Sequence, residues 1–247
     1  MNEIIESLYN RKSVRVFEDK PIPVEYKELI LSCALQAPSA GNMNLYTIID
    51  VTDPKLKETL SQTCDNQPFI AKAPLVLVFC ADYHRWHRLF TKYCDKVRTP
   101  SVGDLNLATA DTLIAAQNCV VAAESLGLGS CYIGDITEDF ERHRELFALP
   151  QHVVPVCMLV IGYPTEQQKN RVKPLRFNAE DVVFENTYNM SKAEKMDEML
   201  RNREDISEEK FPEWVEKFLK RKYNSDFSIE MSRSCIEMIK SFCTKTE

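Results

Sequence analysis

Four residues that can bind an anion lie close together near the N-terminus, in the segment Arg11-Lys12-Ser13-Val14-Arg15. In an extended chain alternate side chains share a face, so Arg11, Ser13 and Arg15 would point the same way. Two guanidinium groups and a hydroxyl can hold a phosphate or an anionic ring edge through paired hydrogen bonds. Taken alone, a basic pentapeptide of this kind is also typical of a solvated loop, and that alternative stays open.

Glycine is scarce, which limits how the chain could hold a phosphate. The sequence has 6 glycines in 247 residues, whereas average usage of about 7% would give roughly 17. None of them form the G-x-G-x-x-G pattern of a dinucleotide-binding turn, and Asp135-Ile136 follows Gly134 where a P-loop needs Lys-Ser/Thr. A bound phosphate must therefore be held mainly by side chains.

Two other groups of residues could do chemistry. His84-x-x-His87 could place two imidazoles on one helix face for zinc. No third ligand has a recognisable spacing, and HRWHRLFTK is more typical of an exposed amphipathic helix, so no metal is expected. Asp111, Glu124 and Asp135 could act as general acids, but none has a histidine or carboxylate partner at a characteristic spacing. We therefore assign no catalytic side chain.

Composition indicates a globular protein of one large or two small domains. It is 44% hydrophobic and 28% charged, with a net charge of −6 and no basic block, which argues against nucleic acid as the main partner. No apolar run reaches the ~18 residues of a membrane span, and the N-terminus lacks the apolar region of a signal peptide. Nine cysteines without C-x-x-C spacing, mostly in apolar stretches, are typical of reduced thiols. A cytoplasmic location is expected.

Strands and helices alternate along the chain, which favours an α/β or α+β architecture. Helices are predicted over 2–10, over 24–36 after Pro23, and from Pro54 to about Cys64. Strands are predicted over 45–52, 74–82 and 152–164, and 130–136 reads as a strand or a strand-like turn.

The segment 106–126 is rich in alanine, with leucine, isoleucine and valine on nearly every side. Such a helix is expected to be buried all round. Its small residues would allow close approach to a sheet or to a second subunit, and Gly127 is placed to end it.

The composition changes near residue 190. Residues 190–222 are rich in Lys, Glu, Asp and Arg with few apolar positions, which is typical of helical decoration or a wrapping arm. Too little apolar surface is present for an independent domain. We expect a core over 1–190 and a C-terminal helical extension over 191–247 that packs on the core or on a partner subunit.

Several motifs in one order resemble the FMN-dependent nitroreductase superfamily. They are RKSVRVFEDKPIP, APSAGNMN, DTLIAAQNCVVAAESLGLGSCYIGDI, IGYP and VKPLRF. The resemblance covers roughly residues 3–190 and is greatest to the branch with the major oxygen-insensitive nitroreductase and flavin reductase P. It implies an α+β fold with a central mixed sheet flanked by helices and with FMN at a homodimer interface. It also implies ping-pong hydride transfer from NAD(P)H to electron-poor acceptors such as nitroaromatics, quinones or free flavin, with the chemistry carried by the flavin.

The resemblance assigns one group of site residues to the N-terminal half. Arg11, Lys12 and Ser13 would hold the phosphate and ribityl end, and Arg15 would reach the pyrimidine edge of the ring. Ser39, in APSAGN, matches a position that bonds the flavin or ribityl chain. Gln67 matches a glutamine near the ring, with a surface amide as the alternative.

A second group follows the alanine-rich helix. Tyr132, Ile133 and Gly134 match a segment whose backbone approaches flavin N5, and a plain strand-end turn is the alternative. Lys173 matches a phosphate-binding lysine, but the usual Lys-Pro-Arg reads Lys-Pro-Leu-Arg here, so Arg176 either reaches the phosphate from one place on or the contact is absent. Asn44 stands where relatives commonly have Gln, and that contact is not carried over.

Other functions stay open. Lys220-Arg221-Lys222 could recognise the 2′-phosphate of NADPH, or it could be a solvated helix end. The chain could instead be a non-redox flavin binder or a specialised flavin enzyme of the same fold. It could also be an interaction protein that uses its acidic C-terminal arm.

Overall fold

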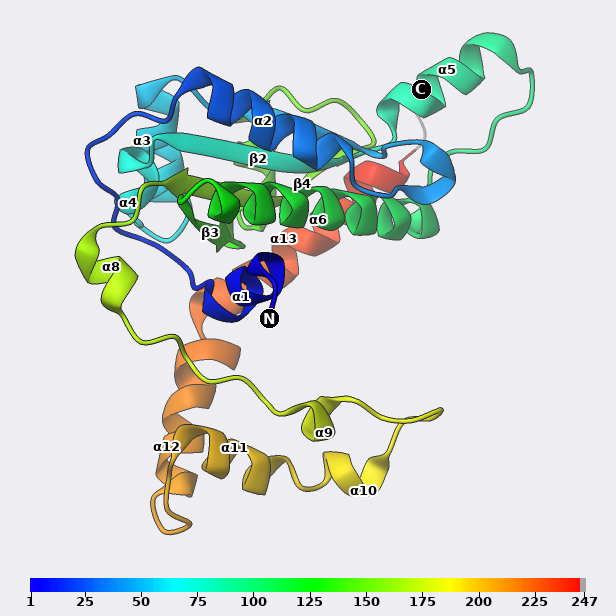
Figure 1. Cartoon of the computed structure of the whole chain (residues 1–247). Coiled ribbons are helices and arrows are strands. Elements are labelled where there is room, and N and C mark those ends of the chain that lie inside the picture. Colours follow the sequence, from blue (N-terminus) through cyan, green and yellow to red (C-terminus); the bar gives the residue numbers. More distant parts are fainter. Residues whose placement is uncertain (245–247) are drawn as a thin grey trace. The chain divides into compact units, whose positions relative to one another are not determined.

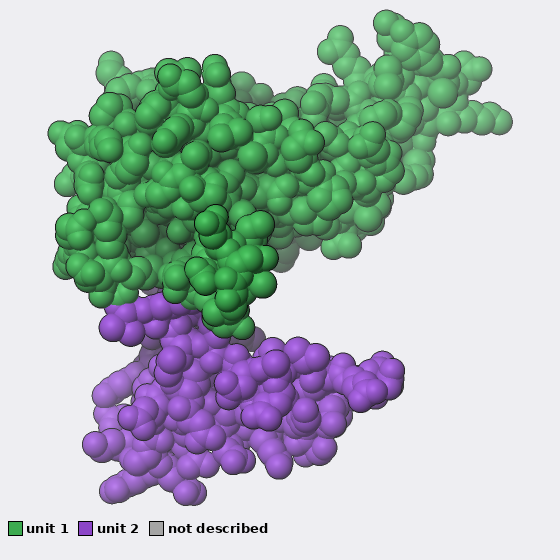
Figure 2. Space-filling model, in the orientation of Figure 1, with its two compact units in different colours: residues 1–171, 229–247 green, residues 172–228 purple. Residues whose placement is uncertain are grey.

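The computed structural model describes residues 1–244 and divides the chain into two compact units (Figure 2). The first contains Met1–Arg171 and the chain from Ile229 onward, and the second is Val172–Ser228. The C-terminal part is therefore divided at other residues than the expected boundary at 190. Helix α13 (Asp226–Cys243) returns to the first unit because Met238 and Phe242 are buried there beside Leu45, Phe140 and Val154.

A four-stranded sheet forms the centre of the first unit. Its order is β1 (Tyr46–Asp50), β2 (Leu75–Asp82), β4 (Val153–Gly162) and β3 (Gly129–Ile133), and each neighbouring pair is antiparallel. The parallel pairing expected of a mixed sheet is supplied by a bridge between Ser13 and Ser130 at the outer edge of β3. The N-terminal segment therefore lies beside β3.

Helices cover both faces of this sheet (Figure 1). Alternate residues of β2 point to opposite sides, so Leu77 and Phe79 pack against α2 (Val24–Leu35) and α6 (Val102–Ser125). Val76 and Val78 pack on the other face, against α3 (Pro54–Thr63) and the segment around Ile136. A strand buried on both sides explains why 74–82 is continuously apolar.

Helix α6 is longer than the sequence predicted and is not buried all round. It begins at a capping box of Ser101 and Asp104, and Gly127 at φ 75° follows its end. One face packs on the sheet, but Val102, Leu107, Leu113 and Ile114 are 41–53% exposed. The first unit covers one face of α6 and leaves an apolar stripe on the other.

The remaining elements agree with the predicted helices at 2–10, 24–36 and 54–64. The other helices of the first unit are α1 (Glu3–Asn10), α4 (Phe69–Lys72), α5 (His84–Tyr93), α7 (Phe140–Leu146) and α8 (Glu166–Asn170), with short 3₁₀ turns at Ala40–Asn42 and Asp135–Thr137. No helix in the described part of the chain is both long and apolar enough to cross a membrane.

The second unit is helical, as its composition predicted. It contains α9 (Ala179–Val182), α10 (Met190–Ala193), α11 (Met196–Glu204), α12 (Phe211–Phe218) and a π-helical turn, Leu219–Tyr223. Ring stacking of Trp214 with Phe211 and Phe218, at centroid distances of 5.9 and 5.1 Å, supports α12.

Candidate functional site

The basic N-terminal segment is fixed along the edge of the sheet. Val14 N donates to Ser130 O at 2.9 Å, and the Val14 side chain is only 4% exposed. Because neighbouring side chains alternate, Ser13 and Arg15 point away from the buried valine. The segment is therefore a docked strand edge and not a solvated loop.

Two glycines allow this close approach. A Cβ at Gly129 would lie 2.5 Å from Val14 Cγ2, and one at Gly162 would lie 2.7 Å from Phe17 Cδ1. The two glycines face each other in the β3–β4 ladder, so they form one gap that receives the N-terminal segment. From the sequence, Gly134 was predicted to matter. The need for glycine at both 129 and 162, where a side chain would clash with the N-terminal segment, was not predicted.

Contacts from distant parts of the chain organise the basic segment. Lys12 Nζ donates to Lys169 O at 2.6 Å and to Arg171 O at 2.5 Å, and the Arg171 guanidinium donates to Ser13 O. An ammonium has three N–H donors, so Lys12 keeps one for a ligand. Arg171 was not predicted, because nothing in its local sequence distinguishes it from a loop arginine.

Arg11 lies near the buried carboxylate of Glu124. Its Nε lies 4.0 Å from Glu124 Oε1, and both atoms are buried without a hydrogen-bond partner in the described part of the chain. Burial raises the pKa of Glu124, while Arg11 and Lys12 act to lower it. Glu124 thus balances part of the positive charge and does not stand alone as a general acid.

Ser13 and Arg15 meet the β3 residue Cys131. Burial raises the pKa of the Cys131 thiol, and the nearby Arg15 together with a hydrogen bond to Ser13 opposes that rise. The Arg15 backbone N also donates to Gln168 Oε1 at 3.3 Å. The structure thus brings Arg11, Lys12, Ser13 and Arg15 together at one sheet edge.

At the end of β3, the side chains of the predicted residues Tyr132 and Ile133 are engaged within the protein, and Gly134 has no side chain. The Tyr132 hydroxyl donates to Gln117 Oε1 of α6 at 3.3 Å, while Ile133 is buried in the core on the opposite face. A Cβ at Gly134 would meet no atom within 4 Å, so the space in front of this residue is open.

Gln67 contacts the turn after β3, at Asp135, although it lies 68 residues earlier in the chain. Its Nε2 donates to Asp135 Oδ2 at 2.8 Å and to Cys64 O at 2.9 Å. Asp135 also has a carboxyl neighbour, Glu138, whose pKa is raised to about 7 by burial and by Asp135. The sequence found no carboxylate partner for Asp135, and the structure corrects that interpretation.

Ser39 lies in a turn that contacts a different part of α6 from the part beside Arg11. It exchanges hydrogen bonds with Asn44 at 2.9 and 3.1 Å, and Asp111 accepts the backbone N–H groups of Ala40 and Leu45. Asp111 is therefore a buried support for this turn. It is 13 residues from Glu124 on α6, which at 1.5 Å per residue is about 20 Å. Within one chain, Ser39 and the Arg11 cluster (Arg11, Lys12, Ser13 and Arg15) thus lie beside different parts of α6.

Lys173 and Arg176 belong to the second unit, where Arg176 Nη1 donates to Pro174 O at 3.1 Å. The basic run at 220–222 lies there too. Lys220 pairs with Glu216 at 2.6 Å, while Arg221 and Lys222 lie near the rings of Phe218 and Phe227. A phosphate contact by any of these residues stays a prediction.

The two histidines of α5 make protein contacts. His84 Nδ1 lies 3.1 Å from Gln151 O, and the His87 ring meets the His152 ring edge-on at 4.9 Å. Among residues 1–244, no group of three or more His, Cys, Asp or Glu is placed to hold a metal ion.

Comparisons with known proteins agree on one family. The model of the nitroreductase family matches residues 8–163. The chain is 34% identical to an FMN reductase (NADPH) of Bacillus subtilis over 193 residues, 77% of this chain and 76% of the relative. It is 36% identical to an oxygen-insensitive NADPH nitroreductase of Salmonella typhimurium over 205 residues, 83% and 80% of the two chains.

Solved structures show the same likeness. An NADPH:FMN oxidoreductase from Vibrio harveyi, complexed with NAD⁺, superposes with a TM-score of 0.72 at 33% identity over 82% of this chain and 86% of its own. NfrA1 of B. megaterium superposes with a TM-score of 0.84 at 29% identity over 98% and 100%.

Proposed function

Because the chain belongs to the nitroreductase family and is an FMN-dependent NAD(P)H oxidoreductase, we propose that its sheet edge around residues 11–15 is half of the FMN site. The observation that carries this proposal is the docking of the basic segment on β3, where Ser13 pairs with Ser130 and both Ser13 and Arg15 lie beside Cys131.

The donors at this edge suit FMN. Arg11 Nε and Ser130 Oγ are buried and have no hydrogen-bond partner in the part of the chain that the structure describes. Buried polar groups of this kind are costly unless they find a partner. A phosphate oxygen accepts hydrogen bonds from guanidinium and hydroxyl groups, so these donors support an anionic ligand here.

Each residue then has a specific task. We assign the phosphate and ribityl end to Arg11, Ser13 and the remaining N–H of Lys12. When bound, FMN would supply the two-electron chemistry between NAD(P)H and an electron-poor acceptor such as a nitroaromatic, a quinone or a free flavin.

The other half of the set positions the ring. Arg15 supplies a fixed positive charge for the negative charge that develops at the pyrimidine edge on reduction. We assign the ring to the amide of Gln67 and to the backbone from Tyr132 to Gly134, since a Cβ at Gly134 would meet no atom within 4 Å. The side chain of Gln67 is already held by Asp135, so little ordering is needed when a ligand binds.

A second copy of the chain completes this site. Ser39 and the Arg11 cluster are about 20 Å apart along α6, so one protomer does not bring both to one ligand. The exposed stripe of Val102, Leu107, Leu113 and Ile114 provides an apolar face for association. We therefore propose a homodimer in which Ser39 of one protomer faces the Arg11 cluster of the other.

NADPH is the proposed electron donor, since the Bacillus and Salmonella relatives are both named for it. All nine cysteines are free thiols in the structure, which supports a reducing compartment, and we propose the cytoplasm.

Titration of the apoprotein with FMN tests the binding site. Arg11→Ala and Arg15→Ala should each weaken FMN affinity by about tenfold or more, the range of a charge-assisted hydrogen bond. Arg88→Ala, which removes an exposed arginine of α5, is the matched control and should bind FMN like the wild type. Unchanged affinity in both site variants would remove the segment from the proposed site.

A further inference from the structure

The turn after β3 brings two carboxyl groups together. Asp135 begins the 3₁₀ turn Asp135–Thr137, and Glu138 N donates back to Asp135 O at 3.0 Å. Residues three apart in such a turn lie one above the other, so the two carboxyl groups lie on the same side of the turn. Glu138 is only 8% exposed, and its Oε1 is buried with no hydrogen-bond partner among the described residues.

Asp135 connects this pair to Gln67. It accepts one amide N–H of Gln67 at 2.8 Å, while Cys64 O accepts from the same nitrogen at 2.9 Å. An amide nitrogen has two donors, so both are used and the oxygen Oε1 is the free end of the side chain. The direction in which Gln67 presents its amide therefore depends on Asp135.

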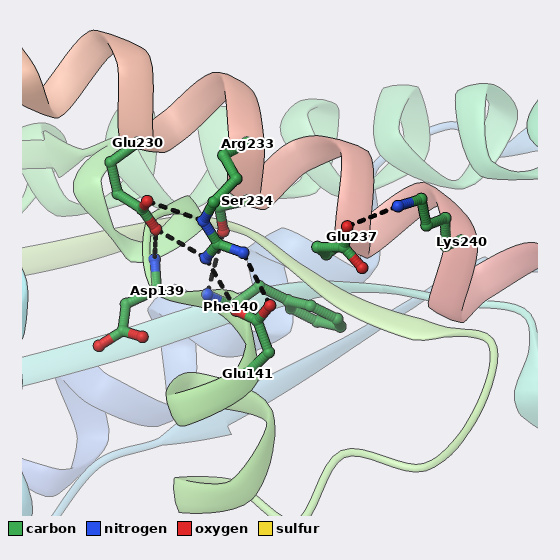
Figure 3. Close-up of polar contacts among 8 residues, drawn as sticks. All are labelled: Asp139, Phe140, Glu141, Glu230, Arg233, Ser234, Glu237 and Lys240. Carbon is green, nitrogen blue, oxygen red and sulfur yellow. Dashed lines mark hydrogen bonds and ion pairs between the residues drawn. The ribbon is translucent and has the colours of Figure 1, made fainter.

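Helix α13 contacts the residues that directly follow Glu138 in the chain, Asp139 to Glu141 (Figure 3). Asp139 takes a left-handed conformation at φ 44°, and its N–H donates to Glu230 Oε1 at 3.2 Å. Phe140 N then donates to Ser234 Oγ at 3.0 Å. Arg233 forms ion pairs with both Glu141 and Glu230 at 2.8 Å. These contacts hold the chain directly after Glu138 against α13.

The surroundings of Glu138 disfavour a second negative charge. Asp135, Asp65 and Glu230 all act to raise its pKa, and Glu230 is itself engaged with Arg233. On the side of α7, the pKa of His143 is lowered by burial, so this ring is neutral near pH 7. Burial raises the pKa of the neighbouring Cys64 thiol to about 12, so it is also uncharged. The named groups that affect the pKa of Glu138, namely Asp135, Asp65 and Glu230, are all carboxyl groups.

We propose that Glu138 donates a proton to a hydrogen bond with Asp135, and that this pair positions Gln67 and makes FMN affinity depend on pH. The inference rests on the proposed FMN site. Glu138 and Asp135 are positioning residues, since their effect on the ligand passes through Gln67 and through charge.

The direction of the pH effect follows from charge. Loss of the Glu138 proton leaves two carboxylates side by side and adds a negative charge near an anionic ligand. We expect this to lower FMN affinity by roughly fivefold to tenfold between pH 6 and pH 8, around the pKa of about 7.

The variant Glu138→Gln separates this effect from the titration of the FMN phosphate itself. Glutamine can still donate to Asp135 but does not ionise. The ratio of the wild-type to the Glu138→Gln dissociation constant for FMN should be near one at about pH 6 and reach about ten at about pH 8. Glu145→Gln removes an exposed carboxylate of the nearby helix α7 and should follow the wild type at every pH.

Carbon-13 NMR of the glutamate carboxyls in the apoprotein gives a second readout. The wild type should show one carboxyl that titrates near neutrality, and Glu138→Gln should lack it. A flat affinity ratio, or no carboxyl that titrates near pH 7, would overturn the inference. Wild-type protein that binds no FMN at any pH would instead refute the proposed function, and with it this inference.

Discussion

Gly129→Ala tests whether the close contact between Val14 and Gly129 holds the basic segment 11–15 in place for FMN binding. The added Cβ would lie 2.5 Å from Val14 Cγ2 and 2.9 Å from Val14 Cβ, so Val14 must leave its position. Exposing the valine side chain costs about 1.5–3 kcal/mol, and losing the Val14 N to Ser130 O hydrogen bond costs about 1 kcal/mol. We expect a loss of about 2–4 kcal/mol in the free energy of unfolding, and displacement of Arg11, Ser13 and Arg15.

Denaturant unfolding of the apoprotein and FMN titration measure the two consequences. The variant should unfold at lower denaturant and bind FMN at least about tenfold more weakly. Gly103→Ala is the matched control, because a Cβ there meets no atom within 4 Å and helix α6 favours alanine. Val14→Ala removes the valine contacts without a clash and should show a smaller loss. Gly129→Ala with wild-type stability and FMN affinity would refute the reasoning.

Three further outcomes are expected. Arg171→Ala should release Ser13 O and the loop that holds Lys12, and should weaken FMN binding by about tenfold. The control Lys92→Ala on α5 should leave FMN affinity unchanged. Equal FMN affinity in Arg171→Ala and the wild type would show that Arg171 does not support the site. Leu113→Glu should place a charge on the exposed stripe of α6 and give a monomer of 28.5 kDa in light scattering; a dimer that persists would exclude this stripe as the interface. Folding raises the pKa of Glu138, so the free energy of unfolding of the wild type should fall as pH rises through about 7. Glu138→Gln should be more stable than the wild type by about 2 kcal/mol at pH 8 and equal to it below pH 4.5. A constant difference in stability across this pH range would contradict the assignment.

The sequence predicted most helices and strands of the core. Periodicity and breaker residues placed the helices at 2–10 and 24–36 and the buried strand at 74–82, because those signals are local. The anion site was predicted from residue types and stays a prediction; the structure shows Ser13 paired with Ser130 at the edge of β3.

The missed features depend on contacts between distant residues. Arg171 supports Ser13 across 158 residues, and Gln67 meets Asp135 across 68. Local spacing carries no signal for either contact. Glu138 was overlooked because its raised pKa comes from burial and not from its neighbours in sequence alone. The exposed stripe of α6 could not be told from a buried face, since both are apolar.

Anaerobic reduction of the purified protein tests the central claim most directly. A protein that holds FMN at the Arg11 cluster should be yellow and should lose its visible flavin absorption when NADPH is added without oxygen. A nitroaromatic or quinone added afterwards should restore the colour. Colourless protein that takes up no FMN, or yellow protein that NADPH and NADH both leave unbleached, would contradict the account.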